Sequence, residues 1–290
     1  MIDTVYAHTL ESESVPYPSC WKPFRVACTD TRDHTGQSVT YYVKVRPQSE
    51  DRRRDAAAMQ VSEIIGLGVA AGMGLKTHRA AFVVISPEFA AQISERPGYP
   101  LVCGGSHFGT RWLDSVVDGT ADNIPAYASG QDLLRLWVLD CWLGILDRVG
   151  NNEGNLLFLY EDGSFALIAS DHSDCFDGAG RFTREHLGQM QSGAGWLAEY
   201  PLVKQCILDA PGCGSLEEAI DRARFAGTQL DAILALVPED WWQDADLDPE
   251  NVRNCLTSRA NRLHEICKLE HYRNEEKGLR NGIANGGQLF

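Results

Sequence analysis

A lysine stands inside an apolar run that has the alternation of a β-strand. The run is Tyr41-Tyr42-Val43-Lys44-Val45, and its apolar positions continue an alternation that starts at Val39 and predicts a strand. A cation within such a segment is costly to bury unless it meets an anion. We therefore expect Lys44 to face an anionic group, and a phosphate of ATP is one such anion.

Two carboxylates and an amide follow Lys44 at the ends of apolar segments. Asp147 comes directly after a helical stretch, Asn155 precedes Leu156-Leu157-Phe158, and Asp171 ends a strand-like run that includes Leu167 and Ile168. One carboxylate can orient an attacking hydroxyl, while an amide and a second carboxylate are oxygen ligands suited to Mg²⁺. With Lys44, the set is typical of phosphoryl transfer from ATP. Asn152 is an alternative to Asn155 for the same role.

Glu63 lies in a helical stretch that is otherwise poor in charge, from Asp55 to Ile65. Kinases pair a strand lysine with a helix carboxylate, which fixes the lysine on the phosphates. The sequence therefore predicts an ion pair between Lys44 and Glu63. The alternative is a solvated carboxylate on the helix surface.

The order and spacing of these residues resemble the HipA-like kinase family, which is distantly similar to phosphatidylinositol 3/4-kinase catalytic domains. The likeness covers roughly residues 20 to 265, and the corresponding stretches are Val43-Lys44-Val45, Ser62-Glu63-Ile64-Ile65, Leu146-Asp147-Arg148, Gly154-Asn155-Leu156-Leu157-Phe158, Ile168-Ala169-Ser170-Asp171-His172 and Leu236-Val237-Pro238-Glu239-Asp240-Trp241.

The resemblance implies a role for each residue. Lys44, steadied by Glu63, would hold phosphate oxygens of ATP. Asn155 and Asp171 would bind Mg²⁺. Asp147 would orient a hydroxyl acceptor and accept its proton, with protein Ser/Thr favoured over a lipid or a metabolite as the acceptor. The implied activity is that of an ATP-dependent kinase.

The chain departs from the family pattern at three places. Val149 stands in the loop after Asp147, and that loop is longer than the common form. Ile145 stands where the family often has Asn. No glycine-rich phosphate loop precedes Lys44, and a segment that includes Ser19 and Lys22 occupies its place. These departures favour an alternative, a pseudokinase that acts as a nucleotide-binding or partner-binding module.

The succession of elements predicts an α+β protein with the two-lobed layout of a protein kinase. Alternating strands around 24–46 and 78–85, a third short run at 100–103 and one intervening helix would form a β-rich N-terminal lobe, residues 1–113. A mainly helical C-terminal lobe would span 114–277. It would include a buried helix from Gly130, a hairpin turned at Asp162-Gly163, and helices starting at Ser215 and Asp248. Residues 278–290 would form a flexible tail.

Composition limits the partners. A net charge of −14 argues against a nucleic-acid surface, and the basic run Arg52-Arg53-Arg54 is interpreted as a solvated turn. No apolar segment approaches the length needed to cross a membrane, so membrane insertion is not expected. Nine scattered cysteines without a C-x-x-C pair favour a reducing compartment, so a cytoplasmic location is expected.

Three further motifs fail on context. The G-x-G-x-x-A match at 66–71 follows a helical pattern instead of a strand. Asp244, Asp246 and Asp248 imitate the start of a calcium loop that lacks its glycine and its bidentate glutamate. The His/Cys spacings at 172–175 and 264–267 each lack a second pair for zinc.

Overall fold

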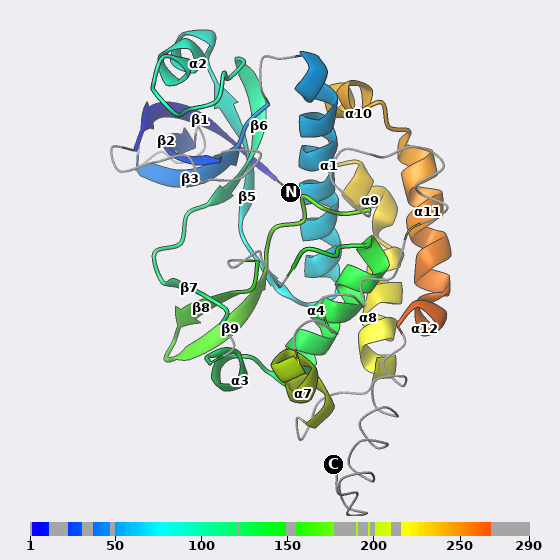
Figure 1. Cartoon of the computed structure of the whole chain (residues 1–290). Helices are drawn as coiled ribbons and strands as arrows, with labels where there is room; N and C mark the ends of the chain where they lie inside the picture. Colours follow the sequence, from blue (N-terminus) through cyan, green and yellow to red (C-terminus); the bar gives the residue numbers. More distant parts are fainter. Residues whose placement is uncertain are drawn as a thin grey trace, which may run out of the picture.

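The computed structural model describes residues 2–11, 23–30, 37–46, 50–120, 122–148, 155–176, 190, 197, 201–209 and 216–267. Helices and strands are both abundant, as the expected α+β class requires. The strands lie on one side of the molecule and most of the helices on the other (Figure 1). The division at residues 113 and 114 stays a prediction.

Five strands form a closed barrel in the order β1-β2-β3-β6-β5. They are β1 (Asp3–Leu10), β2 (Phe24–Asp30), β3 (Ser38–Lys44), β5 (Ala80–Ile85) and β6 (Gly105–Arg111). The predicted antiparallel pair is present, with Phe24 opposite Val43. The parallel pair β1–β5 closes the barrel. Its interior is apolar, and helix α2 (Pro87–Ser94) adds Phe89 and Ile93 to that core.

A second sheet has the order β4-β9-β8-β7. Its strands are β4 (Lys76–Thr77), β9 (Ser164–Ala169), β8 (Leu157–Glu161) and β7 (Val116–Asp118). The predicted hairpin is the antiparallel pair β8–β9. Asp162 and Gly163 both have positive φ, 51° and 81°, which is the conformation that an Asp-Gly hairpin turn adopts.

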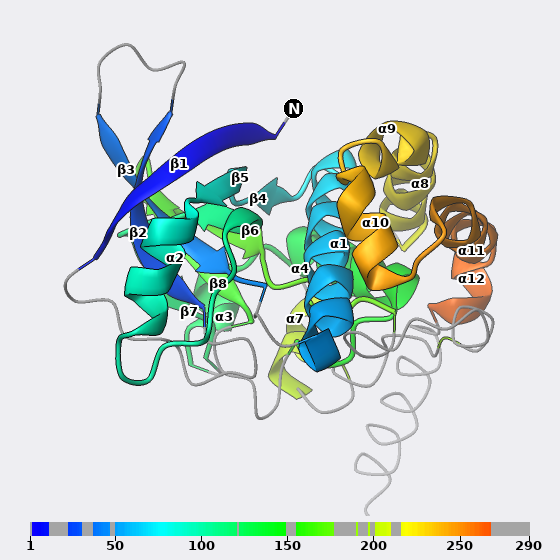
Figure 2. The ribbon, with the colours of Figure 1, turned by 90° about the horizontal axis from the view of Figure 1, so that it is seen from above.

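Helix α1 (Glu50–Gly72) is longer than the sequence suggested, and it runs alongside the barrel and the other helices (Figures 1 and 2). The helical stretch expected from Asp55 to Ile65 is too short, because α1 continues through Gly66 and Gly68 to Gly72. These glycines are contact points, because an added Cβ would come within 2.3 Å of His172 at Gly66, 2.7 Å of Ile233 at Gly68 and 2.9 Å of Ala226 at Gly72. Gly is present where neighbouring elements approach the helix backbone most closely.

The expected turn at Arg52-Arg53-Arg54 is also wrong, since these residues lie in the first turns of α1. Arg53 forms an ion pair with Asp244 at 3.0 Å, and Arg54 forms one with Asp246 at 3.3 Å. Two of the three aspartates that imitate a calcium loop, Asp244 and Asp246, therefore face arginines.

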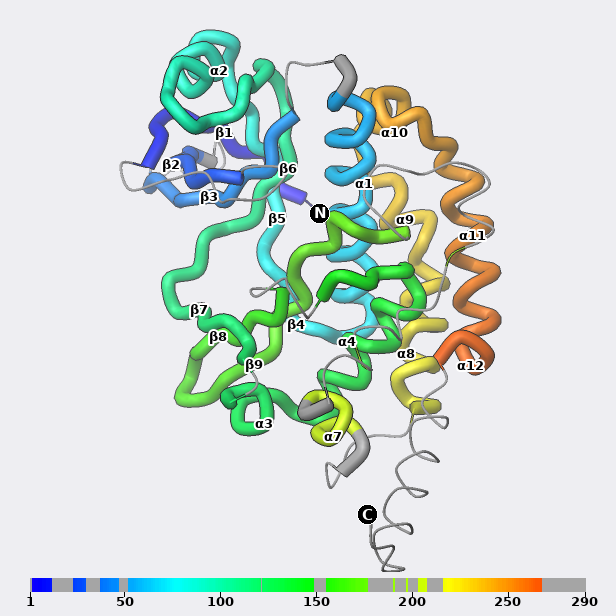
Figure 3. The backbone as a smooth tube through the Cα atoms, in the orientation of Figure 1, coloured from blue at the N-terminus to red at the C-terminus, as the bar shows by residue number. Residues whose placement is uncertain are grey.

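Of the remaining helices, α8 to α12 lie on the far side of α1 from the barrel, whereas α3 contacts β9 of the second sheet and α7 packs against α3 and α4 (Figure 3). They are α3 (Ile124–Tyr127), α4 (Gly130–Leu143), α7 (Pro201–Asp209), α8 (Leu216–Gly227), α9 (Leu230–Leu234), α10 (Glu239–Ala245), α11 (Pro249–Asn261) and α12 (Leu263–Ile266). The buried helix from Gly130 is confirmed as α4. Asp248 caps α11 by accepting a hydrogen bond from the backbone N–H of Glu250 at 3.1 Å. Ser215 and the tail 278–290 lie outside the described residues.

Several elements were not predicted, among them β1, β4, β6, β7, α2, α3, α7 and α10. The short strand expected at 100–103 is not formed, and the strand in this region is β6. None of the described helices is long and apolar enough to cross a membrane.

Candidate functional site

Lys44 ends strand β3 between two carboxylates. Its Nζ donates to Oε1 of Glu63 in α1 and, at 2.8 Å, to Oδ1 of Asp171, which follows β9. The Lys44 side chain is 13% exposed, that of Glu63 3% and that of Asp171 33%. The ion pair expected between Lys44 and Glu63 is therefore present, and a second carboxylate joins it.

Charge pairing fixes the ionisation of this group. Burial disfavours the Lys44 ammonium ion, but Asp171 and Glu63 outweigh that cost, and the pKa of Lys44 lies above its ordinary value. Burial likewise opposes ionisation of the two acids. The Lys44 charge outweighs it and holds the pKa of Asp171 and of Glu63 below the usual range. All three side chains are charged at neutral pH.

The segment that follows β9 is also bonded to α1. Oε2 of Glu63 accepts a hydrogen bond from the backbone N–H of His172 at 3.2 Å. The His172 ring is fully buried against Gly66, and the Cys175 thiol donates to the carbonyl of Ser62 at 3.7 Å. These residues pack the site against the helix.

Asp171 has a left-handed backbone conformation, with φ of 49°. Few non-glycine residues adopt it, although Asp tolerates it better than most. Ser173 stabilises the turn, because its hydroxyl donates to Oδ1 of Asp171 at 2.6 Å and its backbone N–H donates to the same oxygen at 3.4 Å. The turn directs the Asp171 carboxylate back towards Lys44.

Arg148 joins the segments that carry the other polar residues. Its guanidinium is fully buried and binds both oxygens of Asp140, in α4, at 2.6 and 2.9 Å. Its Nη1 donates to the carbonyls of Asn155, at 3.0 Å, and Ser170, at 2.6 Å. The residue before Asp171 is thus held on the same nitrogen as Asn155. This role of Arg148 was not predicted, although an acid in an apolar helix, Asp140, signals a buried cation.

Asn155 and Asp147 contact each other directly. The Asn155 amide donates to the backbone carbonyl of Asp147 at 3.0 Å and to its Oδ2 at 3.4 Å. Burial raises the pKa of Asp147 to about 8, and a hydrogen-bonded carboxyl at Asp174, together with Asp171, adds to the rise, while Arg148 opposes it. Asp174 was missed, since a third acid just after Asp171 has no distinguishing pattern in sequence.

The described structure thus assembles two groups, Lys44–Glu63–Asp171 and Asp147–Asn155, which Arg148 connects. Ser19, Lys22, Val149 and Asn152 lie outside the described residues. No cluster of three or more His, Cys, Asp or Glu side chains suited to a metal occurs in the described part of the chain. Asn155 and the ionised Asp171 still fit Mg²⁺, which commonly takes one or two protein oxygens together with substrate phosphates and water.

Helix α10 anchors the end of β3 close to Lys44. Arg46 is 8% exposed. Its Nη1 lies 2.9 Å from Asp244 and 3.6 Å from Asp240, and its guanidinium carbon lies 5.7 Å from the ring centroid of Trp241. Asp244 also binds Arg53 of α1. One carboxylate in α10 therefore ties the strand that carries Lys44 to the helix that carries Glu63.

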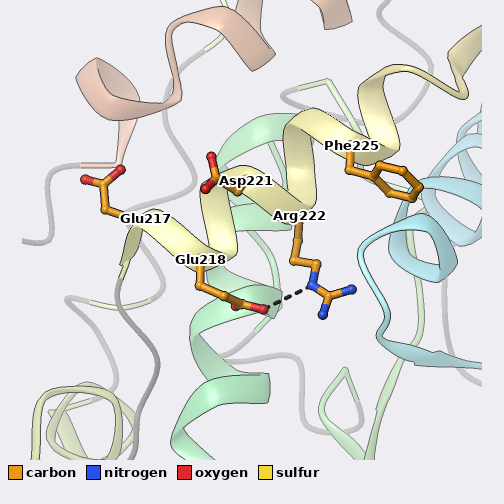
Figure 4. Close-up of a pocket in the computed structure, with 5 residues that line it drawn as sticks. All are labelled: Glu217, Glu218, Asp221, Arg222 and Phe225. Carbon is orange, nitrogen blue, oxygen red and sulfur yellow. Dashed lines mark hydrogen bonds and ion pairs between the residues drawn. The ribbon is translucent and has the colours of Figure 1, made fainter.

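A pocket of about 450 Å³ opens on α8, on the helical side of the molecule and away from the barrel (Figures 1 and 4). Its lining includes Glu218, Arg222 and Phe225. Glu218 accepts hydrogen bonds from Arg222 at 3.0 Å and from Arg135 at 2.7 Å. The charged side chains of the pocket form ion pairs within the protein, so the pocket does not indicate a ligand.

No protein-family model and no curated protein sequence matches the chain. Among solved structures, it is similar to that of a Helicobacter pylori proinflammatory kinase, CtkA, with a TM-score of 0.44, 11% identity, and coverage of 95% of this chain and 99% of that chain. It is also similar to a hydra Fam20 structure with sugar, with a TM-score of 0.37, 9% identity, and coverage of 84% and 86%. Similarity at this level assigns neither family nor activity.

Proposed function

We propose that this protein is an ATP-dependent kinase of the HipA-like type, which transfers the γ-phosphoryl group of ATP to a hydroxyl, with protein Ser/Thr favoured over a lipid or a metabolite. The observation that carries the proposal is the position of Lys44 between two carboxylates. One comes from α1 and the other follows β9, 127 residues away in sequence. An ammonium group fixed in this way is a phosphate ligand in kinases.

Lys44 would hold phosphate oxygens, with Glu63 keeping the ammonium group in place. Asn155 and Asp171 would hold magnesium, which neutralises charge on the phosphates when bound. The lowered pKa of Asp171 supports this role, because a hard cation binds the ionised carboxylate.

Asp147 would orient the acceptor hydroxyl and take its proton. Its pKa of about 8 is close to physiological pH. Acid–base catalysis is most effective when the pKa of the group lies near the working pH. A carboxyl with the ordinary pKa would be a weaker base.

The raised pKa of Asp147 also supports a second candidate, a pseudokinase that binds nucleotide without phosphoryl transfer. A carboxyl with a pKa of about 8, hydrogen-bonded to Asp174, is largely protonated at neutral pH. If nothing lowers that pKa when nucleotide binds, Asp147 cannot accept a proton.

The first test is nucleotide binding. Millimolar Mg-ATP should raise the melting temperature, since a ligand bound only by the folded state stabilises it. Lys44→Met should remove most of that shift, and Glu63→Ala should reduce it less, because Asp171 still contacts the lysine. Lys76→Met, the same change at a half-exposed lysine in β4, is the matched control and should retain the shift.

Absence of any shift in the parent protein would contradict nucleotide binding, and a full shift in Lys44→Met would contradict our placement of the phosphates. Autophosphorylation with labelled ATP and magnesium, read as intact mass, then separates the candidates. Added phosphate supports the kinase. Tight binding without transfer to protein, lipid or metabolite acceptors supports the pseudokinase.

A further inference from the structure

Gln60 is a fully buried polar side chain of α1 that contacts the lysine strand. Its Nε2 donates to the backbone carbonyl of Lys44 at 2.6 Å. Gln60 lies three residues before Glu63, so the two side chains share one face of the helix. Glu63 binds the ammonium group of the same lysine. One helix therefore contacts both ends of Lys44, the backbone through Gln60 and the side chain through Glu63.

The backbone that follows Lys44 is held from within the barrel. Nδ1 of His107, in β6, accepts a hydrogen bond from the Arg46 N–H at 3.0 Å, and Nε2 of His107 lies 3.0 Å from the carbonyl of Cys103. Burial and the Arg46 charge lower the pKa of His107 to about 4, so its ring is neutral and Nδ1 can accept. These contacts join β3 to β6 of the same barrel. The Gln60 contact differs, because it joins the barrel to the helix that carries Glu63.

The other polar atom of Gln60 argues against a role in stability alone. Its Oε1 is buried and has no hydrogen-bond partner among the described residues. A buried acceptor without a partner disfavours folding, and a methionine of similar length would avoid that cost. Residues that lower stability are common where function requires them. The hydrogen bond from Nε2 to Lys44 is the interaction that a methionine could not make.

We propose that Gln60 is a positioning residue, which fixes how far the Lys44 ammonium group reaches towards the phosphates of the nucleotide; this inference rests on the proposed function. A lysine side chain is long and flexible. Because α1 binds both its carbonyl and its ammonium group, any movement of α1 against the barrel carries the whole residue with it. Without the Gln60 amide, the backbone of Lys44 can shift while Glu63 retains the ammonium group, and the ammonium group then meets the phosphates less favourably.

The test is a double-mutant cycle on the affinity for Mg-ATP, measured by calorimetry. Gln60→Met keeps the length of the side chain and removes the amide. It should bind Mg-ATP roughly 3- to 10-fold more weakly than the parent, the loss expected from one hydrogen bond. In the Lys44→Met background the same change should add no further loss, because Gln60 acts through Lys44. An equal loss in both backgrounds would overturn the proposal.

Gln131→Met is the matched control. Gln131, in α4, also donates through its Nε2, to Glu218 of α8, and its Oε1 is likewise buried without a partner in the described part of the chain. This variant should bind Mg-ATP as the parent does. Urea denaturation then separates positioning from stability. The unfolding midpoint of Gln60→Met should be no lower than that of the parent, and a marked drop would overturn the proposal.

If Lys44→Met binds no Mg-ATP, hydrogen exchange of the backbone at 44–46 without nucleotide, read by mass spectrometry, takes the place of the cycle. Exchange there should be faster in Gln60→Met than in the parent and unchanged in Gln131→Met. Equal exchange in all three proteins would overturn the proposal. Parental ATP affinity in Gln60→Met, with a loss in Lys44→Met, would remove only the role of Gln60. A parent protein that does not bind Mg-ATP would contradict the proposed function itself.

Discussion

At the scale of single residues, Arg148 determines how the candidate site is held. One buried guanidinium binds Asp140 in α4 and the carbonyls before and after the β8–β9 hairpin. Asp147, the neighbouring residue, is thereby placed beside Asn155 without contributing to that scaffold. Asp147 and Arg148 are neighbours in sequence. In the structure Arg148 has a structural role, whereas Asp147 is the candidate reactive group.

Arg148→Met should destabilise the protein by about 3–5 kcal/mol, because it leaves the Asp140 charge buried without its partner. Urea denaturation measures the loss. The double variant Arg148→Met/Asp140→Leu removes both charges and should recover part of the stability. If Arg148→Met alone were as stable as the parent, the ion pair between Arg148 and Asp140 would not be needed for stability.

Substitution of the two acids should separate catalysis from binding. Asp147→Ala should lower turnover by about 10² to 10⁴-fold while ATP binding stays largely intact, since the proposed function places this group at the acceptor. Asp171→Ala should weaken both, because in the proposed function Asp171 holds the metal as well as Lys44. Activity and ATP affinity are measured together for each variant. Loss of ATP affinity in Asp147→Ala alone would reverse the assigned roles.

The raised pKa of Asp147 makes stability depend on pH. The unfolded carboxyl ionises near its ordinary value of about 4, while the folded one keeps its proton until about pH 8. The native state thus binds more protons over this interval, and its stability falls as pH rises through it. Asp174→Asn should make this fall shallower.

The measurement is the melting temperature from pH 5 to 8 in the presence of EDTA, which keeps metal from competing with the proton. Asp221→Asn, at an exposed acid of α8, should leave the profile unchanged. Parallel profiles for Asp174→Asn and the parent would show that Asp174 does not hold the Asp147 proton.

At the scale of elements, α1 shows what a sequence can and cannot predict. Its apolar character and the place of Glu63 followed from the pattern of side chains, whereas its start at Glu50 did not, since the expected helical stretch began at Asp55. Its length did not, because Gly66 and Gly68 lower helix propensity and their benefit is visible only in the packing of His172 and Ile233 against them. Helix propensity depends on the local sequence, whereas the tertiary contacts that outweigh it involve residues far away in the chain.

Strand β6 was missed for a related reason. Its sequence, Gly-Ser-His-Phe-Gly-Thr-Arg, has neither alternation nor β-branched side chains in number. It is a strand because β3 and β5 pair with it on both sides. The candidate residues could be predicted because their order and spacing are contained in the chain, whereas the roles of Arg148 and Asp174 depend on distances that only folding sets.

Gly66→Ala should be destabilising and should weaken ATP binding. The added methyl group would lie 2.3 Å from the His172 side chain. The segment that follows β9 and packs against α1 must therefore move, at a cost of about 1–3 kcal/mol of folding stability. That segment carries Asp171. Gly227→Ala, where the new methyl group meets only ordinary contacts beyond 3.7 Å, is the control. A Gly66→Ala protein with parental stability would contradict the close approach.

At the scale of the whole molecule, α10 connects the barrel to α1. Asp244→Asn should lower ATP affinity several-fold, because Arg46 and Arg53 lose their shared carboxylate and the end of β3 is held less firmly. Asp246→Asn removes a largely exposed partner of Arg54 and should have little effect, as surface ion pairs contribute little. Isothermal titration of both variants tests the difference. Equal affinities would show that α10 is not needed to position Lys44.

The anchors of the lysine strand also imply an order of assembly during synthesis. Lys44 meets Glu63 after 19 residues of chain and Asp171 after 127, whereas Arg46 meets Asp244 only after 198. Contacts this distant in sequence form slowly, because a long loop must close first. On the ribosome, the barrel and α1 emerge well before α10. A nascent chain would therefore hold its lysine between both carboxylates while the strand beneath it was still without its final support.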